Sequence, residues 1–310
     1  MRIRATVAAV SGALALSAFA IPGAHAADAS AASRADVAKV QEAARAASGK
    51  TAFSTSSAAD TGTPYALDLS FSAVKVNNGK PIVAGIANKV TAPVTFNITH
   101  AADVDITADD FILDMEIYRG SYEEPDSILF GDELPVCTAT STTAATCKGT
   151  IDVYPDTDLV NADATTWKAI GYAVALNGVD ITADDVDWSK VGYVEQDALA
   201  TTKLQRYSKL TVNASPEPVT KGKTITVTGK LSRANWETHK YAGYTGQSVQ
   251  LQFRKKGSDT YTTVKTIKTD STGNLKTTTT ASVDGYFRYS FAGTATTPAV
   301  KATGDYVDVQ

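Results

Sequence analysis

Apolar and polar residues alternate with a period of two over most of the chain after residue 64, and β-branched residues are frequent in these stretches. Successive side chains of a strand point to opposite faces, so this alternation predicts half-buried β-strands. Up to residue 204 we expect strands over 65–76, 81–86, 90–99, 111–119, 136–138, 146–153, 167–176 and 190–195. Short strands separated by polar turns, with little helix, are typical of a β-sandwich.

The alternation is more regular from residue 205 to the end, in the stretches KTITVTGKLSR, SVQLQFRKK, TYTTVKTIK, NLKTTTTASV, YFRYSFAG and DYVDVQ. Asp270-Ser271-Thr272-Gly273 has the composition of a hairpin turn. An opening strand over 209–214 brings the count to about seven, as expected of an immunoglobulin-like sandwich. We therefore predict an all-β chain of two tandem β-sandwich domains, the second immunoglobulin-like.

This carboxyl-terminal third, with KGKTITVTGKL, GQSVQLQFRKKGSDTYTTVKTIKTDSTGNLKTTTTASVDGYFRYSFAG and GDYVDV, resembles the immunoglobulin-like domains of secreted actinobacterial proteins. The preceding half resembles the amino-terminal module of such proteins, some of which are labelled calcium-binding. The resemblance implies a spacer, a wall-associated module or a ligand-binding unit.

The first residues have the pattern of a secretory leader. Arg2 and Arg4 precede an uncharged apolar run that ends in Ala24-His25-Ala26, a signal-peptidase pattern, so we expect residues 1–26 to be removed. An amino-terminal membrane anchor is the alternative, but the run is short for a span. No later stretch is long and apolar enough for a transmembrane anchor. The sequence predicts a secreted, extracellular or cell-wall-associated protein.

Residues 27–64 are rich in Ala, Ser and Thr and predict a flexible arm and linker. A helix over 33–48 is expected, with Ser33 as N-cap and Gly49 as the stop. Its only sizeable apolar residues are Val37 and Val40, a stripe that predicts weak docking at best.

Charge distinguishes the two predicted domains, which we place at 65–204 and 205–310. Residues 66–203 hold 22 acidic and 8 basic side chains, a net charge of −14. Residues 206–310 hold 7 acidic and 15 basic side chains, a net charge of +8. Such asymmetry bears on partners rather than on fold. An exported protein with a strongly acidic domain is a poor candidate for binding nucleic acid.

The two cysteines, Cys137 and Cys147, flank a Ser/Thr/Ala-rich loop. In an exported protein this spacing predicts one disulfide across a hairpin. A metal site is the alternative, but nearby histidines to complete a zinc shell are lacking.

The heptapeptide VDITADD occurs twice, at 104–110 and 179–185. Calcium prefers six to eight oxygen ligands, so these carboxylates predict a Ca²⁺ site. Neither copy has EF-hand spacing, and Thr-Ala-Asp-Asp is also ordinary turn chemistry in which side chains bond to their own backbone. Both interpretations, and a duplicated half-domain, stay open. The metal candidates are Asp105, Asp109, Asp110, Asp180, Asp184, Asp185 and Asp187.

The basic half has cationic side chains near aromatic rings. Such a face could hold an anionic wall polymer such as teichoic acid, or a glycan chain, by Coulomb attraction and ring stacking. The alternative is that the lysines protect strand edges. The ligand-binding candidates are Trp236, Tyr241, Tyr244, Arg254, Lys255 and Lys256.

Catalytic motifs are lacking: the sequence has no HExxH, GxSxG, P-loop or GxGxxG pattern, and we name no catalytic residue. The sequence therefore predicts a non-enzymatic binding or structural module. A hydrolase that uses paired carboxylates is one alternative. The other is a secreted inhibitor or toxin-like protein that inserts the hairpin at Cys137 and Cys147 into a partner.

Overall fold

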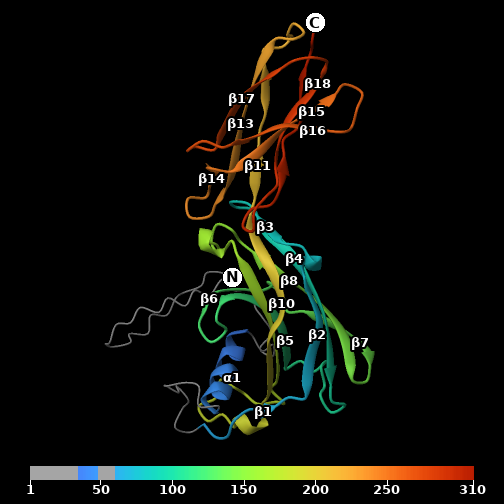
Figure 1. The fold of residues 1–310 in the computed structure, drawn as a ribbon. Helices are drawn as coiled ribbons and strands as arrows, with labels where there is room; N and C mark the ends of the chain where they lie inside the picture. Colours follow the sequence, from blue (N-terminus) through green and yellow to red (C-terminus); the bar gives the residue numbers. More distant parts are fainter. Residues whose placement is uncertain (1–33, 48–59) are drawn as a thin grey trace, which may run out of the picture. The chain divides into compact units, whose positions relative to one another are not determined.

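The computed structural model describes residues 34–47 and 60–310, so the predicted leader and two segments of the arm, 27–33 and 48–59, lie outside the described residues. The chain forms two compact units (Figure 1). The acidic unit comprises residues up to 79, 91–152 and 168–201. The immunoglobulin-like unit comprises 80–90, 153–167 and 202–310. It thus takes in two segments that the charge pattern grouped with the acidic half.

Two sheets form the acidic unit. In the first, neighbouring strands follow the order β1 (Tyr65–Ala66), β10 (Gly192–Arg206), β9 (Thr166–Ala175), β5 (Phe111–Gly120) and β6 (Pro125–Leu129). In the second, the order is β2 (Leu69–Val76), β4 (Val90–His100), β8 (Ala144–Val153) and β7 (Val136–Ser141). A short β3 (Ile82–Ala84) pairs with the last residues of β10, within the immunoglobulin-like unit.

The two sheets pack face to face, as the alternating pattern predicts. On β5, Met115 and Ile117 are buried on the inner face. Gly171 on β9 allows the close approach, because a Cβ there would lie 2.9 Å from the Phe71 ring of β2 and 3.0 Å from the Met115 methyl. Phe71 also contacts Phe96, with ring centroids 5.8 Å apart. The first predicted domain is therefore a β-sandwich.

Helix α1 (Arg34–Ala47) covers the other face of the first sheet. Val37 and Val40, only 2% and 0% exposed, pack in one cluster with Ile112, Tyr172 and Val174. The helix was predicted over nearly these residues, but the expectation that its narrow apolar stripe docks only weakly is wrong, because both valines are buried against the sheet. The stripe suffices because Arg34 also forms an ion pair with Asp114 of β5.

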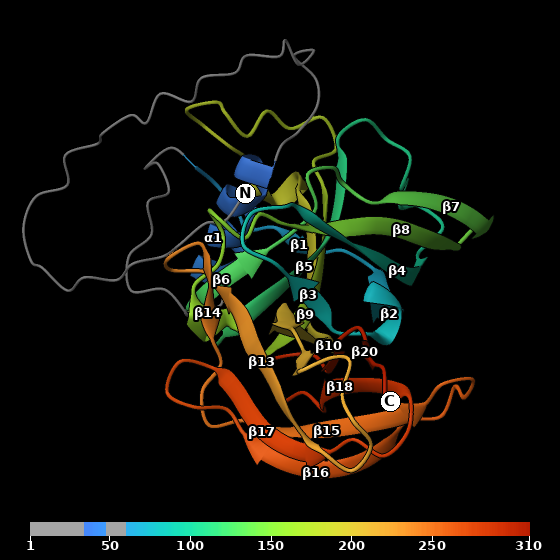
Figure 2. The ribbon, with the colours of Figure 1, turned by 90° about the horizontal axis from the view of Figure 1, so that it is seen from above.

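The immunoglobulin-like unit is a second sandwich (Figure 2). One sheet is built on β13 (Thr224–Asn235), and its other strands are β11 (Ser208–Leu210), β12 (Asn213–Ser215), β14 (Lys240–Gly243) and β17 (Asn274–Thr280). The other contains β16 (Thr262–Lys268), β15 (Ser248–Lys255), β18 (Gly285–Phe291), β19 (Val300–Lys301) and β20 (Asp305–Val307).

The core of this unit lies between its two sheets. Val227, Leu231, Leu251 and Phe287 are buried there together. Tyr289 of β18 reaches across the core, and its hydroxyl donates to the Val227 carbonyl oxygen at 2.9 Å. The predicted immunoglobulin-like sandwich is confirmed.

Local features complete the fold. The predicted disulfide is confirmed, since Cys137 of β7 and Cys147 of β8 are directly opposite and bonded. Short 3₁₀ helices lie at η1 (Asn77–Gly79), η2 (Asn161–Asp163) and η3 (Trp188–Lys190). Strand β6 was not predicted, because PDSIL is short and begins with proline. Within the described part of the chain, no helix has the length and apolarity to cross a membrane.

Candidate ligand-binding surfaces

Both copies of VDITADD form the same local turn. In the first copy, the backbone N–H and the hydroxyl of Thr107 donate to Asp105 Oδ1 at 2.9 and 2.6 Å. In the second, the corresponding groups of Thr182 donate to Asp180 Oδ1 at the same two distances. These hydrogen bonds, the threonine hydroxyl first, lower the pKa of both carboxyls. The turn interpretation of the repeat therefore has a structural basis in each copy.

The two copies lie at the same end of one sheet. The first copy leads into β5 and the second follows β9, and the adjoining residues Phe111 and Ala175 are paired across these strands. Asp110 Oδ2 accepts a hydrogen bond of 2.6 Å from the N–H of Gly178, just before the second copy. Segments that this hydrogen bond joins over 68 positions thus meet, which the sequence left open.

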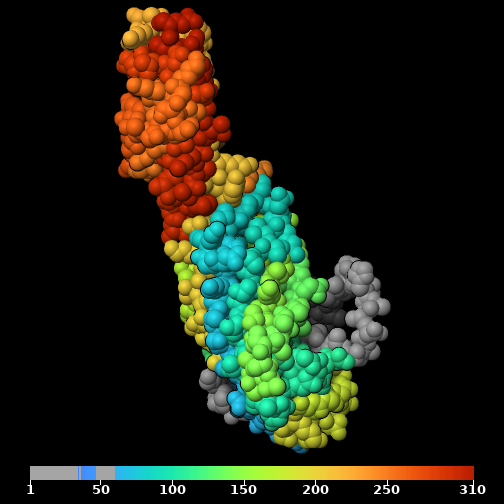
Figure 3. Space-filling model, turned by 90° about the vertical axis from the view of Figure 1, so that its right-hand side faces the viewer, coloured from blue at the N-terminus to red at the C-terminus, as the bar shows by residue number. Residues whose placement is uncertain are grey.

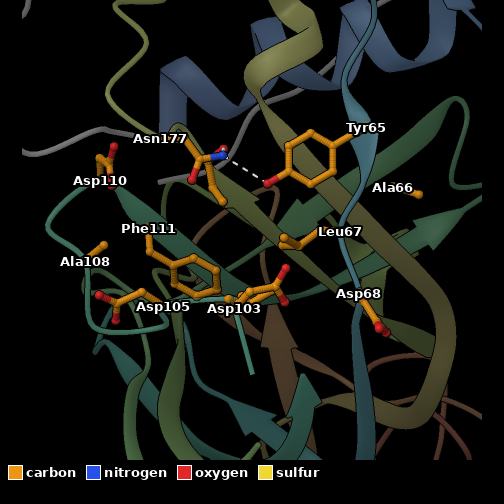
Figure 4. A pocket seen from close by; sticks show the side chains of 12 residues that line it. Tyr65, Ala66, Leu67, Asp68, Asp103, Asp105, Ala108, Asp110, Phe111 and Asn177 are labelled. Carbon is orange, nitrogen blue, oxygen red and sulfur yellow. Dashed lines mark hydrogen bonds between the residues drawn. The ribbon is translucent and has the colours of Figure 1, made fainter. Parts of the chain in front are cut away.

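An acid-lined pocket of about 330 Å³ opens beside the first copy (Figure 4). Four carboxylates line it, those of Asp68, Asp103, Asp105 and Asp110. Tyr65 closes one side, and its hydroxyl accepts a hydrogen bond of 3.0 Å from Asn177 Nδ2. Two of the four carboxylates already hold the loops, through Thr107 and Gly178.

The metal candidates do not all converge on this pocket. Asp105 and Asp110 line it, whereas Asp109, Asp184 and Asp185 are exposed outside its lining. Asp187 accepts from the Ser189 hydroxyl and pairs with Lys190 at η3. Over residues 34–47 and 60–310, no group of three or more His, Cys, Asp or Glu side chains is arranged to hold a metal ion. Calcium binding stays a prediction.

The aromatic members of the predicted basic patch have unequal exposure. Trp236 is only 1% exposed, and its Nε1 donates to the Gly85 carbonyl oxygen at 2.7 Å. Tyr241 is half-buried, with Lys209 Nζ 3.7 Å from its ring centroid. Tyr244 is half-buried under the Arg233 guanidinium, at 3.8 Å, and against Phe291. Trp236 thus packs inside, while the two tyrosines keep part of their rings at the surface.

The predicted patch is divided between two sheets. Tyr241 is on β14, in the sheet built on β13, whereas Arg254 and Lys255 end β15 in the other sheet. Arg254 therefore has neighbours that the sequence interpretation did not name. Its guanidinium lies 3.8 Å from the ring centroid of Tyr286 and 5.4 Å from that of Tyr261.

These contacts extend into a row on the outer face of the β15–β18–β20 sheet. Arg288 lies 3.6 Å from the Tyr261 ring centroid, and the rings of Tyr286 and Tyr306 are 5.1 Å apart. Lys256 Nζ ends the row, 5.4 Å from the Tyr306 centroid and 3.4 Å from Asp284 Oδ2. We call this the tyrosine–arginine face: Arg254, Lys256, Tyr261, Tyr286, Arg288 and Tyr306.

Strand register builds this face. Arg254 is opposite Tyr286 across β15 and β18, and Tyr286 is opposite Tyr306 across β18 and β20. Residues directly opposite each other share one side of a sheet. Gly304 leaves room for Tyr261, since a Cβ there would lie 2.2 Å from the Tyr261 hydroxyl. The alternation in YFRYSF, with apolar Phe287 and Tyr289 inward, is the sequence signal that could have revealed Tyr286 and Arg288.

The arginines of the face keep donor capacity. A guanidinium has five N–H donors. Arg254 donates from Nη1 to the Ser258 carbonyl oxygen at 2.8 Å, and Arg288 donates from Nε to Gln252 at 2.9 Å. Both side chains are partly exposed. Ring stacking and one hydrogen bond fix each guanidinium, and these hydrogen bonds use only one of its five N–H donors.

Another group of charges lies beneath helix α1. The Tyr172 hydroxyl donates to Glu116 Oε1 at 3.1 Å and to Asp114 Oδ2 at 3.3 Å, and Asp114 is paired with Arg34. Burial and the charge of Asp114 raise the pKa of Glu116 to about 7. Burial also raises the pKa of Asp114. This carboxylate pair has the raised pKa of a general acid, but the helix packs over it.

Comparisons with known proteins give no family. No family model matches the chain, and no curated protein matches it. Among solved structures, the Yersinia pseudotuberculosis adhesin InvE is 12% identical with a TM-score of 0.24, over 77% of this chain and 60% of that one. Domains A168–A170 of titin are 8% identical with a TM-score of 0.24, over 80% and 68% of the two chains.

A third structure, the BSP domain of a biofilm-associated protein, is 8% identical with a TM-score of 0.23, over 88% of this chain and 54% of that one. The chain thus spans little more than half of that structure and 60% of InvE. Similarities this distant give no basis for transferring an activity or a ligand. The function has to be inferred from the residues of this chain.

Proposed function

We propose that the protein is an exported, non-enzymatic binding module whose immunoglobulin-like unit holds an anionic polymer of the cell wall on the tyrosine–arginine face. The observation that carries the proposal is the row of stacked guanidiniums and tyrosine rings on the outward side of a sheet. Outward strand positions in this unit otherwise carry mostly Thr, Lys and Gln. Arginine and tyrosine are the residues enriched where proteins make contacts.

The chemistry of the face fits a polymer with repeated negative charges. Arginine binds phosphate and carboxylate through paired N–H groups, and stacking on an aromatic ring fixes its plane. Tyrosine rings add a flat surface for sugar or polyol stacking. The net charge of +8 over residues 206–310 would draw a polyanion to this unit. A leader pattern and a disulfide support a location outside the cytoplasm.

The test is binding of the mature chain, residues 27–310, to an immobilised poly(glycerol phosphate) teichoic acid, with neutral dextran as reference. The double variant Arg254→Gln, Arg288→Gln should weaken binding by about tenfold or more, since each loses a charge-assisted contact. The matched control is Lys230→Gln, Lys276→Gln, which removes equal charge from the other sheet.

Three outcomes separate the interpretations. Loss in the arginine variant with retention in the lysine control supports the proposed face. Equal loss in both would mean that only net charge attracts the polymer. Stronger binding to neutral dextran than to teichoic acid would replace the polyanion with a neutral glycan and contradict the proposal.

A further inference from the structure

Strand β7 (Val136–Ser141) is an open edge of the four-stranded sheet. Its partner is β8 on one side, and none of the described strands pairs with its other side. Most of its residues are exposed, and Val136 is 73% exposed. Figure 2 shows the β7–β8 hairpin projecting from the acidic unit, and Figure 3 shows it as a green strip at the surface.

This edge lacks the residues that normally prevent strands from pairing. Proteins protect edge strands with charged side chains, proline or bulges. At the other edge of the same sheet, β2 has Lys75 and a register shift. The edge strand β6 has Pro125 and Asp126, and β16 has Lys265 and Lys268. Strand β7, with the sequence VCTATS, has no charge and no proline, and its register shift lies at the turn end of the strand, between Ala139 and Ser141, so that 136–139 pair regularly with β8.

The backbone of β7 presents its open groups in a symmetric arrangement. Cys137 and Cys147 are directly opposite with Cα atoms 4.0 Å apart, the close spacing of a non-hydrogen-bonded pair. Ala139 and Ala145 form the next pair of this kind. The N–H and C=O groups of Cys137 and Ala139 therefore point away from β8, one on either side of Thr138.

A groove lined largely by apolar residues lies beside the same edge. It has a volume of about 230 Å³, and its lining includes Cys137 and Ala139 of β7 together with Ile106, Phe111, Leu113 and Leu134. A strand added to β7 would extend the sheet past the mouth of this groove. Pairing would thus remove apolar surface from water as well as satisfy backbone groups.

We propose that β7 pairs antiparallel with β7 of a second copy of this chain, about a two-fold axis at Thr138. In this register Cys137 of one copy exchanges backbone hydrogen bonds with Ala139 of the other, and the two Thr138 side chains are neighbours. A second copy satisfies these open groups, because a two-fold axis at Thr138 places Cys137 of each copy opposite Ala139 of the other. The neutral strand also opposes no like charges across the axis.

The experiment measures sedimentation of the mature chain, residues 27–310, over a wide range of concentrations. The wild type should form a reversible dimer. Thr138→Lys and Thr138→Glu should each raise the dimer dissociation constant by about tenfold, because the register puts like charges opposite each other. An equimolar mixture of the two variants should dimerise at least as well as the wild type.

Two controls test the register and the backbone contacts. Thr142→Lys, in the exposed turn of the same hairpin, should leave the dimer unchanged. Ala139→Pro removes an outward N–H, which edge strands tolerate, and should weaken the dimer without unfolding the unit. Circular dichroism of each variant checks the fold.

Salt distinguishes this dimer from attraction between acidic and basic units of different copies. Pairing of two acidic units should strengthen as salt screens their repulsion, whereas attraction between opposite charges should weaken. A wild type that stays monomeric up to its solubility limit overturns the proposal. So does a Thr138→Lys variant that dimerises like the wild type, or a mixture that does not recover.

Discussion

The two units treat the outer face of a sheet in opposite ways. In the acidic unit, a group of polar residues lies between a sheet and helix α1. There Arg34 forms an ion pair with Asp114, and the Tyr172 hydroxyl donates to Asp114 and Glu116. In the immunoglobulin-like unit, arginine and tyrosine stand on an outer face with no described helix over it. Similar residue types thus hold helix α1 to the sheet in the acidic unit and form an accessible surface in the immunoglobulin-like unit. The difference is whether a helix covers the outer face of the sheet.

The largest effect on stability is expected from a substitution that disrupts the packing of helix α1 against the sheet. Val40→Asp would place a carboxylate in the cluster formed by Val37, Tyr172 and Val174 and should destabilise the acidic unit by about 3 kcal/mol. Chemical denaturation measures the loss, and proteolysis reports whether the helix detaches first. Ala38→Asp, on the exposed side of the same helix, is the control. Equal effects of the two variants would show that the helix is not docked.

An intermediate effect is expected from the buried carboxylate. The pKa of Glu116 is about 7 in the folded chain, above its ordinary value of 4.5. The unfolded chain therefore ionises first, and Glu116 lowers stability increasingly as pH rises from 4.5 to about 7. Glu116→Gln removes this penalty while its amide oxygen can still accept from Tyr172.

The variant should exceed the wild type in stability by about 2 kcal/mol at pH 8 and match it near pH 4.5. Denaturation profiles at several pH values test this, with Asp259→Asn as an exposed control. A difference that does not depend on pH would show that Glu116 is not the titrating group.

The smallest effect on stability is expected from substitutions on the tyrosine–arginine face. Arg254→Gln and Arg288→Gln should each change the free energy of unfolding by less than about 0.5 kcal/mol, because partly exposed surface contacts contribute little. Thermal unfolding of the variants used for polymer binding measures this. A loss as large as that of Val40→Asp would mean that these arginines hold the fold, as Arg34 does.

Sequence predicted what depends on neighbours along the chain. Alternation located most strands, and the spacing of Cys137 and Cys147 located the disulfide. Asp105 and Thr107 are two positions apart, so their turn could be recognised without a fold. The docking of α1 depends on Asp114, Glu116 and Tyr172, which lie far along the chain, and no local pattern brings them to Arg34.

Aromatic residues show the same limit. Trp236 was named as a surface candidate because cationic residues lie near it in the sequence, yet its ring is buried and hydrogen-bonded to the Gly85 carbonyl oxygen. Tyr286 and Tyr306 were not named, although they are neighbours on the outer face. Which tyrosine reaches the surface follows from strand register, and register is set by pairing between distant segments.

The repeated heptapeptide is a turn stabilised by hydrogen bonds within itself. Its defining hydrogen bonds, from threonine to the aspartate two residues earlier, are internal, so the segment brings its own geometry wherever it is placed. The first copy precedes β5, and the second follows β9, the strand paired with β5. The same seven residues therefore form a turn at the start of one strand and at the end of another. The two copies are identical although their flanking sequences differ. Use of the same short turn at two places explains this without duplication of a half-domain.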